Sequence, residues 1–127
     1  MALNVLVVDD SAVMRSVLIR TLRLSGLPLT EVFQAGNGAE ALVSLGDHDV
    51  DLALIDINMP VMNGEQLIDH IRADARLAGL ALMVVSTEGS ETRIEALKSK
   101  GASFIHKPFT PEQIRSTVLK VLGVADA

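Results

Sequence analysis

Short apolar runs alternate along the chain with longer stretches in which apolar positions recur every three or four residues. Continuous apolar runs bounded by polar residues are typical of strands buried on both faces of a sheet. Apolar residues at helical spacing predict amphipathic helices. The strands are expected at residues 4–8, 30–35, 51–56, 80–86 and 103–106, and the helices at about 11–25, 39–45, 65–72, 90–101 and 110–123.

The first and last helices carry the clearest signals. In the first, Met14, Val17, Leu18 and Leu22 fall on one side, which is expected to be buried, and Gly26 is a plausible C-terminal stop. In the last, Thr110 stands at the N-cap, Pro111 at the first helical position and Gln113 at the capping-box position. Its buried stripe is expected to consist of Ile114, Val118, Val121 and Leu122, with Leu119 projecting away from it.

Five strands alternating with five helices predict a (βα)5 chain. With short connections and right-handed crossovers, such a chain builds a parallel five-stranded sheet with helices on both faces, a doubly wound α/β fold. No linker, internal repeat or low-complexity tract interrupts the pattern, so residues 1–127 are expected to form one domain.

Composition excludes several kinds of function. The net charge of −5 and an aromatic content of 2% argue against direct nucleic-acid binding, which uses a basic face and stacking side chains. There are no cysteines, which excludes disulfides and thiolate metal sites. The apolar run near the N-terminus is too short for a signal peptide or a membrane span, so a cytoplasmic protein is expected.

Polar residues gather where the predicted strands end. In an open parallel sheet, ligands bind outside the carboxyl ends of the strands. The residues at those ends are Asp9, Asp10, Asp56, Ser86, Thr87 and Lys107. Three carboxylates in one pocket would repel one another, and a hard divalent cation with oxygen ligands relieves that repulsion. Because water must complete the coordination, the pattern favours Mg²⁺ over Ca²⁺.

Asp56 has a further possible role beside such a cation. A carboxylate next to Mg²⁺, with an ammonium and a hydroxyl nearby, can act as a nucleophile toward a phosphoryl group. Lys107 and Ser86 would then neutralise charge on the transferred group. A simpler interpretation of Asp9 and Asp10 is that they cap the helix that begins near Ser11. The acid and the lysine at the other strand ends favour metal binding.

The segments "VLVVDDS", "LALIDINMPVMNG", "LMVVST" and "HKPF" occur in this order over nearly the whole chain. With them the sequence resembles the receiver domains of bacterial two-component response regulators, most of all the free-standing chemotaxis receivers. The resemblance implies a flavodoxin-like sheet of strand order 2-1-3-4-5. It also implies a phosphoacceptor signalling protein that catalyses its own phosphoryl transfer and slow dephosphorylation.

The resemblance assigns roles to individual residues. Asp56 matches the phosphorylated aspartate, and Asp9 and Asp10 match the acid pair that holds Mg²⁺. The backbone carbonyl of Asn58 matches a further metal ligand, and Lys107 matches the family's active-site ammonium.

The residues assigned to the output switch depart from the family pattern. Ser86 matches the switch hydroxyl, with Thr87 as the fallback, and Phe104 matches the switch aromatic. Thr87 stands where the family usually has Ala or Gly, and the segment from Gly101 to Lys107 is one residue shorter than usual. These departures concern the switch and leave the phosphorylation chemistry in place.

The resemblance also implies partners. A sensor histidine kinase would donate the phosphoryl group, and a downstream protein, such as a flagellar motor switch, would bind the altered surface. The expected contact patch is Arg93, Ala96, Leu119 and Lys120, on the last two helices. A monomer is expected, and phosphorylation-driven dimerisation stays open.

Other functions stay open at this point. A phosphorelay intermediate or a phosphate-sink adaptor would use the same site. An aspartyl-phosphate hydrolase is disfavoured because Asp9 and Asp10 are adjacent, whereas dehalogenase-type phosphatases place the nucleophile and the acid two residues apart. A nucleotide or flavin module is disfavoured because no glycine-rich loop follows the first strand.

Overall fold

The computed structural model describes residues 2–57, 59, 61–87, 90–107 and 109–123. The strands are β1 (Leu3–Val8), β2 (Leu29–Ala35), β3 (Leu52–Ile55), β4 (Ala81–Ser86) and β5 (Ala102–His106). The helices are α1 (Ala12–Leu24), α2 (Gly38–Asp47), α3 (Gly64–Ala73), α4 (Glu91–Ser99) and α5 (Pro111–Leu122), with a short 3-10 helix η1 (Ala75–Leu77). Each predicted strand and helix is present with its ends within two residues of the prediction, whereas η1 was not predicted.

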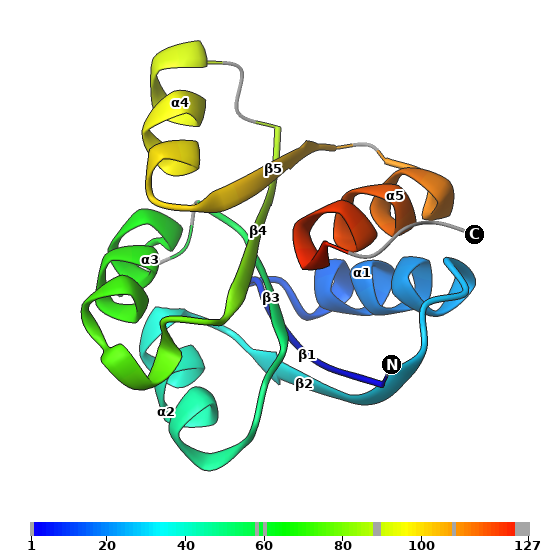
Figure 1. The fold of residues 1–127 in the computed structure, drawn as a ribbon, viewed down its shortest axis with the longest axis horizontal. Coiled ribbons are helices and arrows are strands. Elements are labelled where there is room, and N and C mark those ends of the chain that lie inside the picture. Colours follow the sequence, from blue (N-terminus) through cyan, green and yellow to red (C-terminus); the bar gives the residue numbers. More distant parts are fainter. Residues whose placement is uncertain (1, 58, 60, 88–89, 108, 124–127) are drawn as a thin grey trace.

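The strands form one parallel sheet in the order β2-β1-β3-β4-β5, which confirms the fold class. Helices α1 and α5 cover one face of the sheet, and α2, α3 and α4 lie on the other (Figure 1). Every connection between neighbouring strands therefore passes through a helix, as parallel pairing requires. This arrangement brings the carboxyl ends of all five strands to the same edge of the sheet.

The sheet separates two apolar cores. Leu6 and Val8 of β1 pack into the core beneath α2, α3 and α4, whereas Val5 and Val7 pack into the core beneath α1 and α5. All four side chains are fully buried. Alternate residues of one strand thus face different cores, which explains why the strand sequences are continuous apolar runs.

Two predictions about helix faces were wrong. Val17 was expected to be buried, but half of it is exposed. Leu119 was expected to project outward, but it is only 4% exposed and belongs to the core shared with Leu18 and Leu22 of α1. Because α5 packs against α1 as well as the sheet, its buried residues are Ile114, Val118 and Leu119, whereas Val121 and Leu122, also expected in the stripe, are only partly buried against the same core.

The helix ends have the predicted chemistry. The Ser11 side chain caps α1 by accepting a hydrogen bond from the Met14 N–H, so neither Asp9 nor Asp10 is the N-cap. At α5, Thr110 and Gln113 form the predicted capping box. Capping satisfies backbone N–H groups that have no partner inside the helix.

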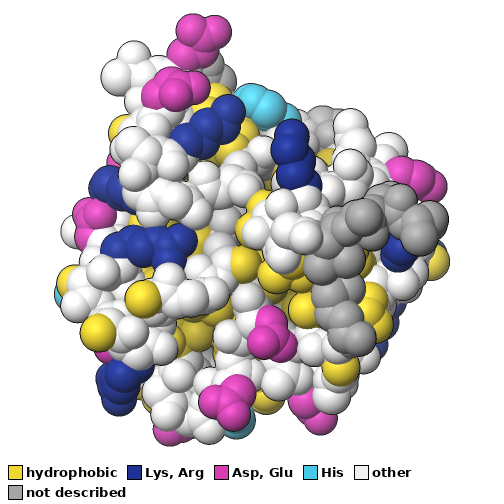
Figure 2. All heavy atoms as spheres, in the orientation of Figure 1, with side chains coloured by type: hydrophobic (Ala, Val, Ile, Leu, Met, Phe, Trp, Pro, Cys, Tyr) yellow, Lys and Arg dark blue, Asp and Glu magenta, His cyan; other side chains and the backbone are white. Residues whose placement is uncertain are grey.

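The molecular surface mixes charges of both signs. On the face in Figure 2, several Lys and Arg side chains lie along the side occupied by α3 and α4, and acidic side chains are interspersed around them. Among the described residues, no helix combines the length and apolar character needed to cross a membrane.

Candidate functional site

Strand register places the acids of β1 and β3 side by side. Val8, the last residue of β1, is aligned with Ile55, the last residue of β3. The Asp56 N–H continues this pairing by donating to the carbonyl of Val8 at 2.9 Å. The residues that immediately follow the two strands, Asp9 and Asp56, are therefore neighbours at the carboxyl edge of the sheet.

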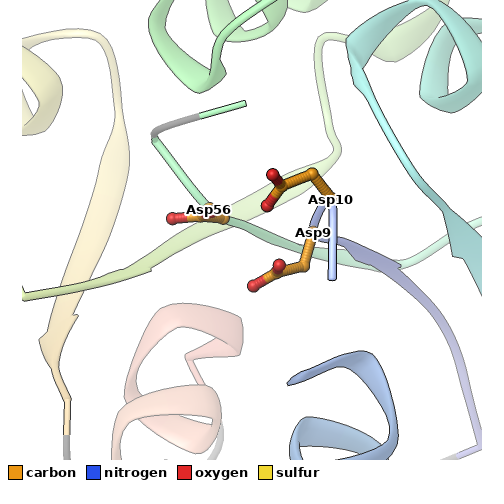
Figure 3. Close-up of side chains that lie close together, drawn as sticks. All are labelled: Asp9, Asp10 and Asp56. Carbon is orange, nitrogen blue, oxygen red and sulfur yellow. The ribbon is translucent and has the colours of Figure 1, made fainter. Parts of the chain in front are cut away.

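Asp9, Asp10 and Asp56 form one acidic cluster. Each offers a carboxylate oxygen, and the three oxygens lie within 4.8 Å of one another. Figure 3 shows the three side chains converging on one region beyond the strand ends. Asp9 is buried, Asp56 is half-buried and Asp10 is exposed, so the cluster has a buried base and an open side.

The Asp9 carboxylate is held in place at one oxygen only. Its Oδ1 accepts a hydrogen bond from the Ser11 N–H at 2.9 Å. Its Oδ2 is buried and has no hydrogen-bond partner among the described residues. A buried carboxylate oxygen without a donor is costly unless a cation approaches it. Together with the two neighbouring acids, this oxygen suits a hard divalent cation.

Lys107 approaches the acids from β5. Its Nζ lies 3.6 Å from Asp9 Oδ2, too far for a hydrogen bond but close enough for an ion pair. The Lys107 side chain is 18% exposed, so water screens this pair less than it would at the surface. The Lys107 backbone N–H donates to the Ser86 carbonyl at 2.9 Å, which links the ends of β4 and β5.

The two candidate switch hydroxyls differ in burial. Ser86 is the last residue of β4 and is 2% exposed, whereas Thr87 is exposed. Phe104 lies on β5 aligned with Val84, is partly buried against the core beneath α2, α3 and α4, and meets the ring of His106 edge-on at 4.7 Å. The structure thus places Ser86 and Lys107 at the acidic edge and Phe104 further back along the sheet.

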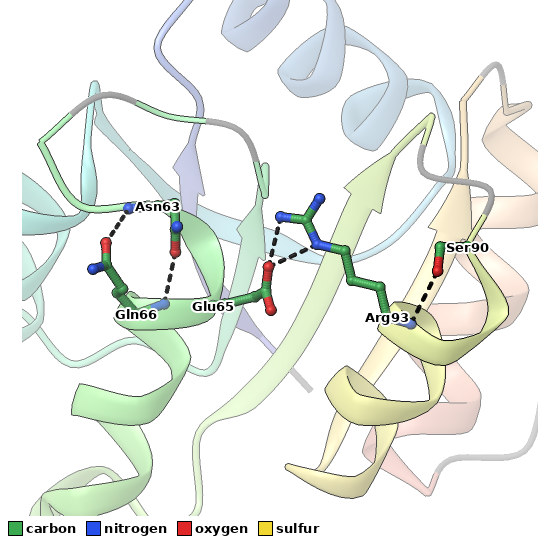
Figure 4. A network of polar contacts seen from close by, with 5 residues as sticks. All are labelled: Asn63, Glu65, Gln66, Ser90 and Arg93. Carbon is green, nitrogen blue, oxygen red and sulfur yellow. Dashed lines mark hydrogen bonds and ion pairs between the residues drawn. The ribbon is translucent and has the colours of Figure 1, made fainter.

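The predicted partner patch is only partly a surface. Ala96 and Lys120 are exposed, as expected. Leu119 is buried, so it offers almost no surface for the predicted contact with a partner. Arg93 is half-buried and its guanidinium points toward α3, where it pairs with Glu65 (Figure 4). The remaining predicted metal ligand, Asn58, lies outside the described residues.

The sequence analysis missed Arg15. Its Nη1 donates to the backbone carbonyl of Asp9 at 2.6 Å, and its Nε donates to Gln34 Oε1 at 3.0 Å. Arg15 therefore ties the turn that carries the acid pair to β2. The position of Arg15 on the first turn of α1, four residues after Ser11, indicated that it could lie near the acid pair. Helical spacing alone placed it only on the polar side of the helix.

The chain matches the model of the response regulator receiver domain over residues 5–119. It therefore belongs to the response regulator receiver family of two-component signalling proteins. Within that family it is homologous to the CheY chemotaxis response regulators. It is 37% identical to chemotaxis protein CheY1 of Helicobacter pylori over 126 residues, which span 98% of this chain and 100% of that protein.

Other relatives and solved structures are similar to this chain over almost its whole length. The chain is 37% identical to the chemotaxis protein CheY homolog of Campylobacter jejuni over 123 residues, 95% of this chain and 93% of that one. Among solved structures, chemotaxis protein CheY4 of Vibrio cholerae matches with a TM-score of 0.83 at 32% identity, covering 95% of this chain and 99% of that one. CheY in the CheX–CheY–BeF3–Mg²⁺ complex from Borrelia burgdorferi matches with a TM-score of 0.85 at 27% identity, covering 94% and 89%.

Proposed function

We propose that this receiver accepts a phosphoryl group on Asp56 from the phosphohistidine of a sensor kinase, and that the modified domain signals by binding another protein. The observation that carries the proposal is the convergence of Asp9, Asp10 and Asp56 at one sheet edge, with Lys107 beside Asp9. The protein would catalyse its own phosphorylation and slow dephosphorylation and no turnover of other substrates.

The residues of the chain have distinct tasks in the proposed transfer. A carboxylate oxygen of Asp56 forms the bond to phosphorus while the bond from phosphorus to the histidine nitrogen of the donor breaks and its electron pair stays on that nitrogen. The Lys107 ammonium, which lies beside Asp9, would neutralise charge on the transferred group. Ser86, at the end of the neighbouring strand, would supply a hydroxyl to a phosphoryl oxygen.

The acidic cluster suits Mg²⁺, which the proposal requires. Asp9, Asp10 and Asp56 would hold the ion, with the Asn58 carbonyl as the further ligand that the family resemblance implies. When bound, Mg²⁺ supplies positive charge that lowers the repulsion between the acceptor carboxylate and an anionic phosphoryl group. Arg15 would keep the Asp9 backbone fixed while the site is filled.

The output is proposed to leave through the side of the molecule formed by α4, β5 and α5. A hollow on that side is lined by Lys98, Phe104, Thr117 and Lys120 among others. Ala96 is exposed on the same helix as Lys98. The CheY relatives, which are named as chemotaxis proteins, support a role in chemotaxis signalling in the cytoplasm, and we propose a flagellar motor component as the target.

Phosphoryl uptake from acetyl phosphate tests the proposal without the kinase. Intact-mass measurement of the wild-type protein is expected to show one added phosphoryl group that depends on Mg²⁺. The Asp56→Asn variant should show none, because an amide is not a nucleophile toward phosphorus at neutral pH. As a control, Asp49→Asn, which changes an exposed aspartate before β3, should label like wild type. Equal labelling of Asp56→Asn and wild type would contradict the proposal.

A further inference from the structure

The first turn of α3 is fixed to the strand that carries the acceptor. The Gly64 N–H donates to the Ile57 carbonyl at 2.8 Å, and a Cβ at Gly64 would lie 2.6 Å from the Asp56 carbonyl oxygen. Asn63 and Gln66 form a capping box in which each side chain accepts from the backbone N–H of the other residue (Figure 4). This turn therefore has little freedom to move relative to the acceptor.

Helix α4 is anchored at its C-terminal end. Arg72 of α3 donates to the carbonyls of Lys100 and Gly101 at 2.8 and 3.1 Å. The Lys100 ammonium also lies 2.8 Å from Asp69 Oδ1 of α3. Within α4 itself, Leu97 is the one fully buried residue, and it stands near the same end. Apolar packing therefore contributes little to holding the N-terminal end of α4.

An ion pair joins the N-terminal end of α4 to α3. Arg93, on the first turn of α4, places its Nη2 2.5 Å from Glu65 Oε1 and donates from Nε to the same oxygen at 2.7 Å. Glu65 lies on the fixed first turn of α3 (Figure 4). The two side chains are 30% and 32% exposed, so the pair is only partly screened by water.

The connection between β4 and α4 is short. Residues 87–90 separate Ser86, the end of β4, from Glu91, the start of α4. Four residues span at most about 14 Å when fully extended, so the length of the connection limits how far its two ends can move apart. If the proposed modification of Asp56 draws the Ser86 end toward it, this short connection would pass the displacement on to the N-terminal end of α4.

We propose that the Glu65–Arg93 ion pair is a latch that holds the N-terminal end of α4 against α3 and opposes its movement when the acceptor site is filled. Helix α4 then acts as a lever with its fixed end at Lys100 and Gly101. The holding role concerns the unmodified protein, whereas the opposition to movement rests on the proposed function of Asp56.

Amide hydrogen exchange of the unmodified protein tests the holding role. Glu65→Gln and Arg93→Gln are each expected to speed exchange at the N-terminal end of α4, for example at the Ile94 N–H that bonds to the Ser90 carbonyl, by about two- to fivefold. The Lys100 N–H at the fixed end should not change. The double variant should exchange no faster than Arg93→Gln alone, because Arg93→Gln already removes the contact that Glu65→Gln removes.

A charge-matched control separates the latch from a general loss of charge. Asp74→Asn removes the exposed pair between Asp74 and Arg76, which touches neither end of α4. It should leave exchange in α4 unchanged. Equal exchange at Ile94 in wild type, Glu65→Gln and Arg93→Gln would overturn the latch, as would single-variant effects that simply add in the double variant.

Binding of beryllofluoride with Mg²⁺, as a phosphoryl mimic, tests the opposition to movement. Glu65→Gln should bind beryllofluoride about two- to fivefold more tightly than wild type, because the latch no longer resists the change. Equal affinities would show that the latch is not coupled to the site, while the proposed function would stand. If wild type binds no beryllofluoride and takes no phosphoryl group from acetyl phosphate, the proposed function fails and so does the coupling, and the exchange rates still decide the holding role.

Discussion

At the residue scale, the most informative feature of the acidic site is one buried carboxylate oxygen, Oδ2 of Asp9. One carboxylate oxygen of Asp9 accepts a hydrogen bond from the Ser11 N–H, and the other, which has no hydrogen-bond partner among the described residues, lies beside Lys107 and two further acids. Such an arrangement is unfavourable in a resting core unless positive charge compensates it. Lys107 supplies part of this charge, and the two neighbouring acids support the proposed role of Asp9 as a metal ligand.

Replacing Asp9 tests this role in binding. Asp9→Asn is expected to lower the affinity for Mg²⁺ by about ten- to a hundredfold, because the variant loses an anionic oxygen that the ion would contact. Isothermal titration with MgCl2 measures the change. Asp49→Asn, at an exposed position before β3, removes the same charge and should leave the affinity near the wild-type value. Unchanged binding by Asp9→Asn would place the ion elsewhere.

The sequence was enough to predict that the residues at the strand ends lie close together, but not which other side chains contact them. The sequence positions of Asp9, Asp56 and Lys107 after apolar runs were enough to predict that they would meet. The bonds from Arg15 to the Asp9 carbonyl and to Gln34 depend on how α1 packs against β1 and β2, which spacing along one helix does not specify.

At the scale of elements, a close approach between α3 and the end of β3 positions Asp56, the proposed acceptor. Gly64 begins α3 directly over the backbone of Asp56 and Ile57. No side chain fits there, since a Cβ would meet backbone atoms at 2.6 and 2.8 Å. The glycine in this connection therefore serves close packing between the helix and the acceptor strand.

Gly64→Ala is expected to lower the free energy of unfolding by about 1–3 kcal/mol, because the backbone of α3 must move away from the acceptor strand. Urea unfolding followed by circular dichroism measures the loss. Gly46→Ala in α2 is the matched control, since nothing lies within 4 Å of its Cβ position. That variant should be stabilised by about 0.5–1 kcal/mol. Equal effects of the two substitutions would show that the close approach at Gly64 does not matter.

Which residues at the border of a helix face are buried could not be predicted from spacing alone. Spacing along α5 identified Ile114 and Val118 as buried but placed Leu119 outside, because the pattern of one helix does not show that α1 lies alongside it. The same packing leaves Val17 half exposed although it shares a helical side with Leu18. Neighbouring helices decide which flanking positions are covered.

For the whole molecule, the doubly wound sheet brings the acidic residues and Lys107 to one edge, and helices cover its two faces. The alternation of strands and helices was sufficient to predict a parallel sheet, and the family resemblance supplied its strand order, which the structure confirms. The contacts that tie α4 to α3 were not predictable, because Arg72, Arg93 and Glu65 meet only after both helices have packed on the same face. The proposed latch belongs to this scale.

A crystal structure of the protein with Mg²⁺ and beryllofluoride tests the central claim most directly. The account predicts beryllium bonded to a carboxylate oxygen of Asp56, Mg²⁺ in contact with this group and with the carboxylates of Asp9 and Asp10 directly or through water, and the Lys107 ammonium facing the fluorides. Beryllofluoride on another residue, or Mg²⁺ bound away from these three aspartates, would contradict the account.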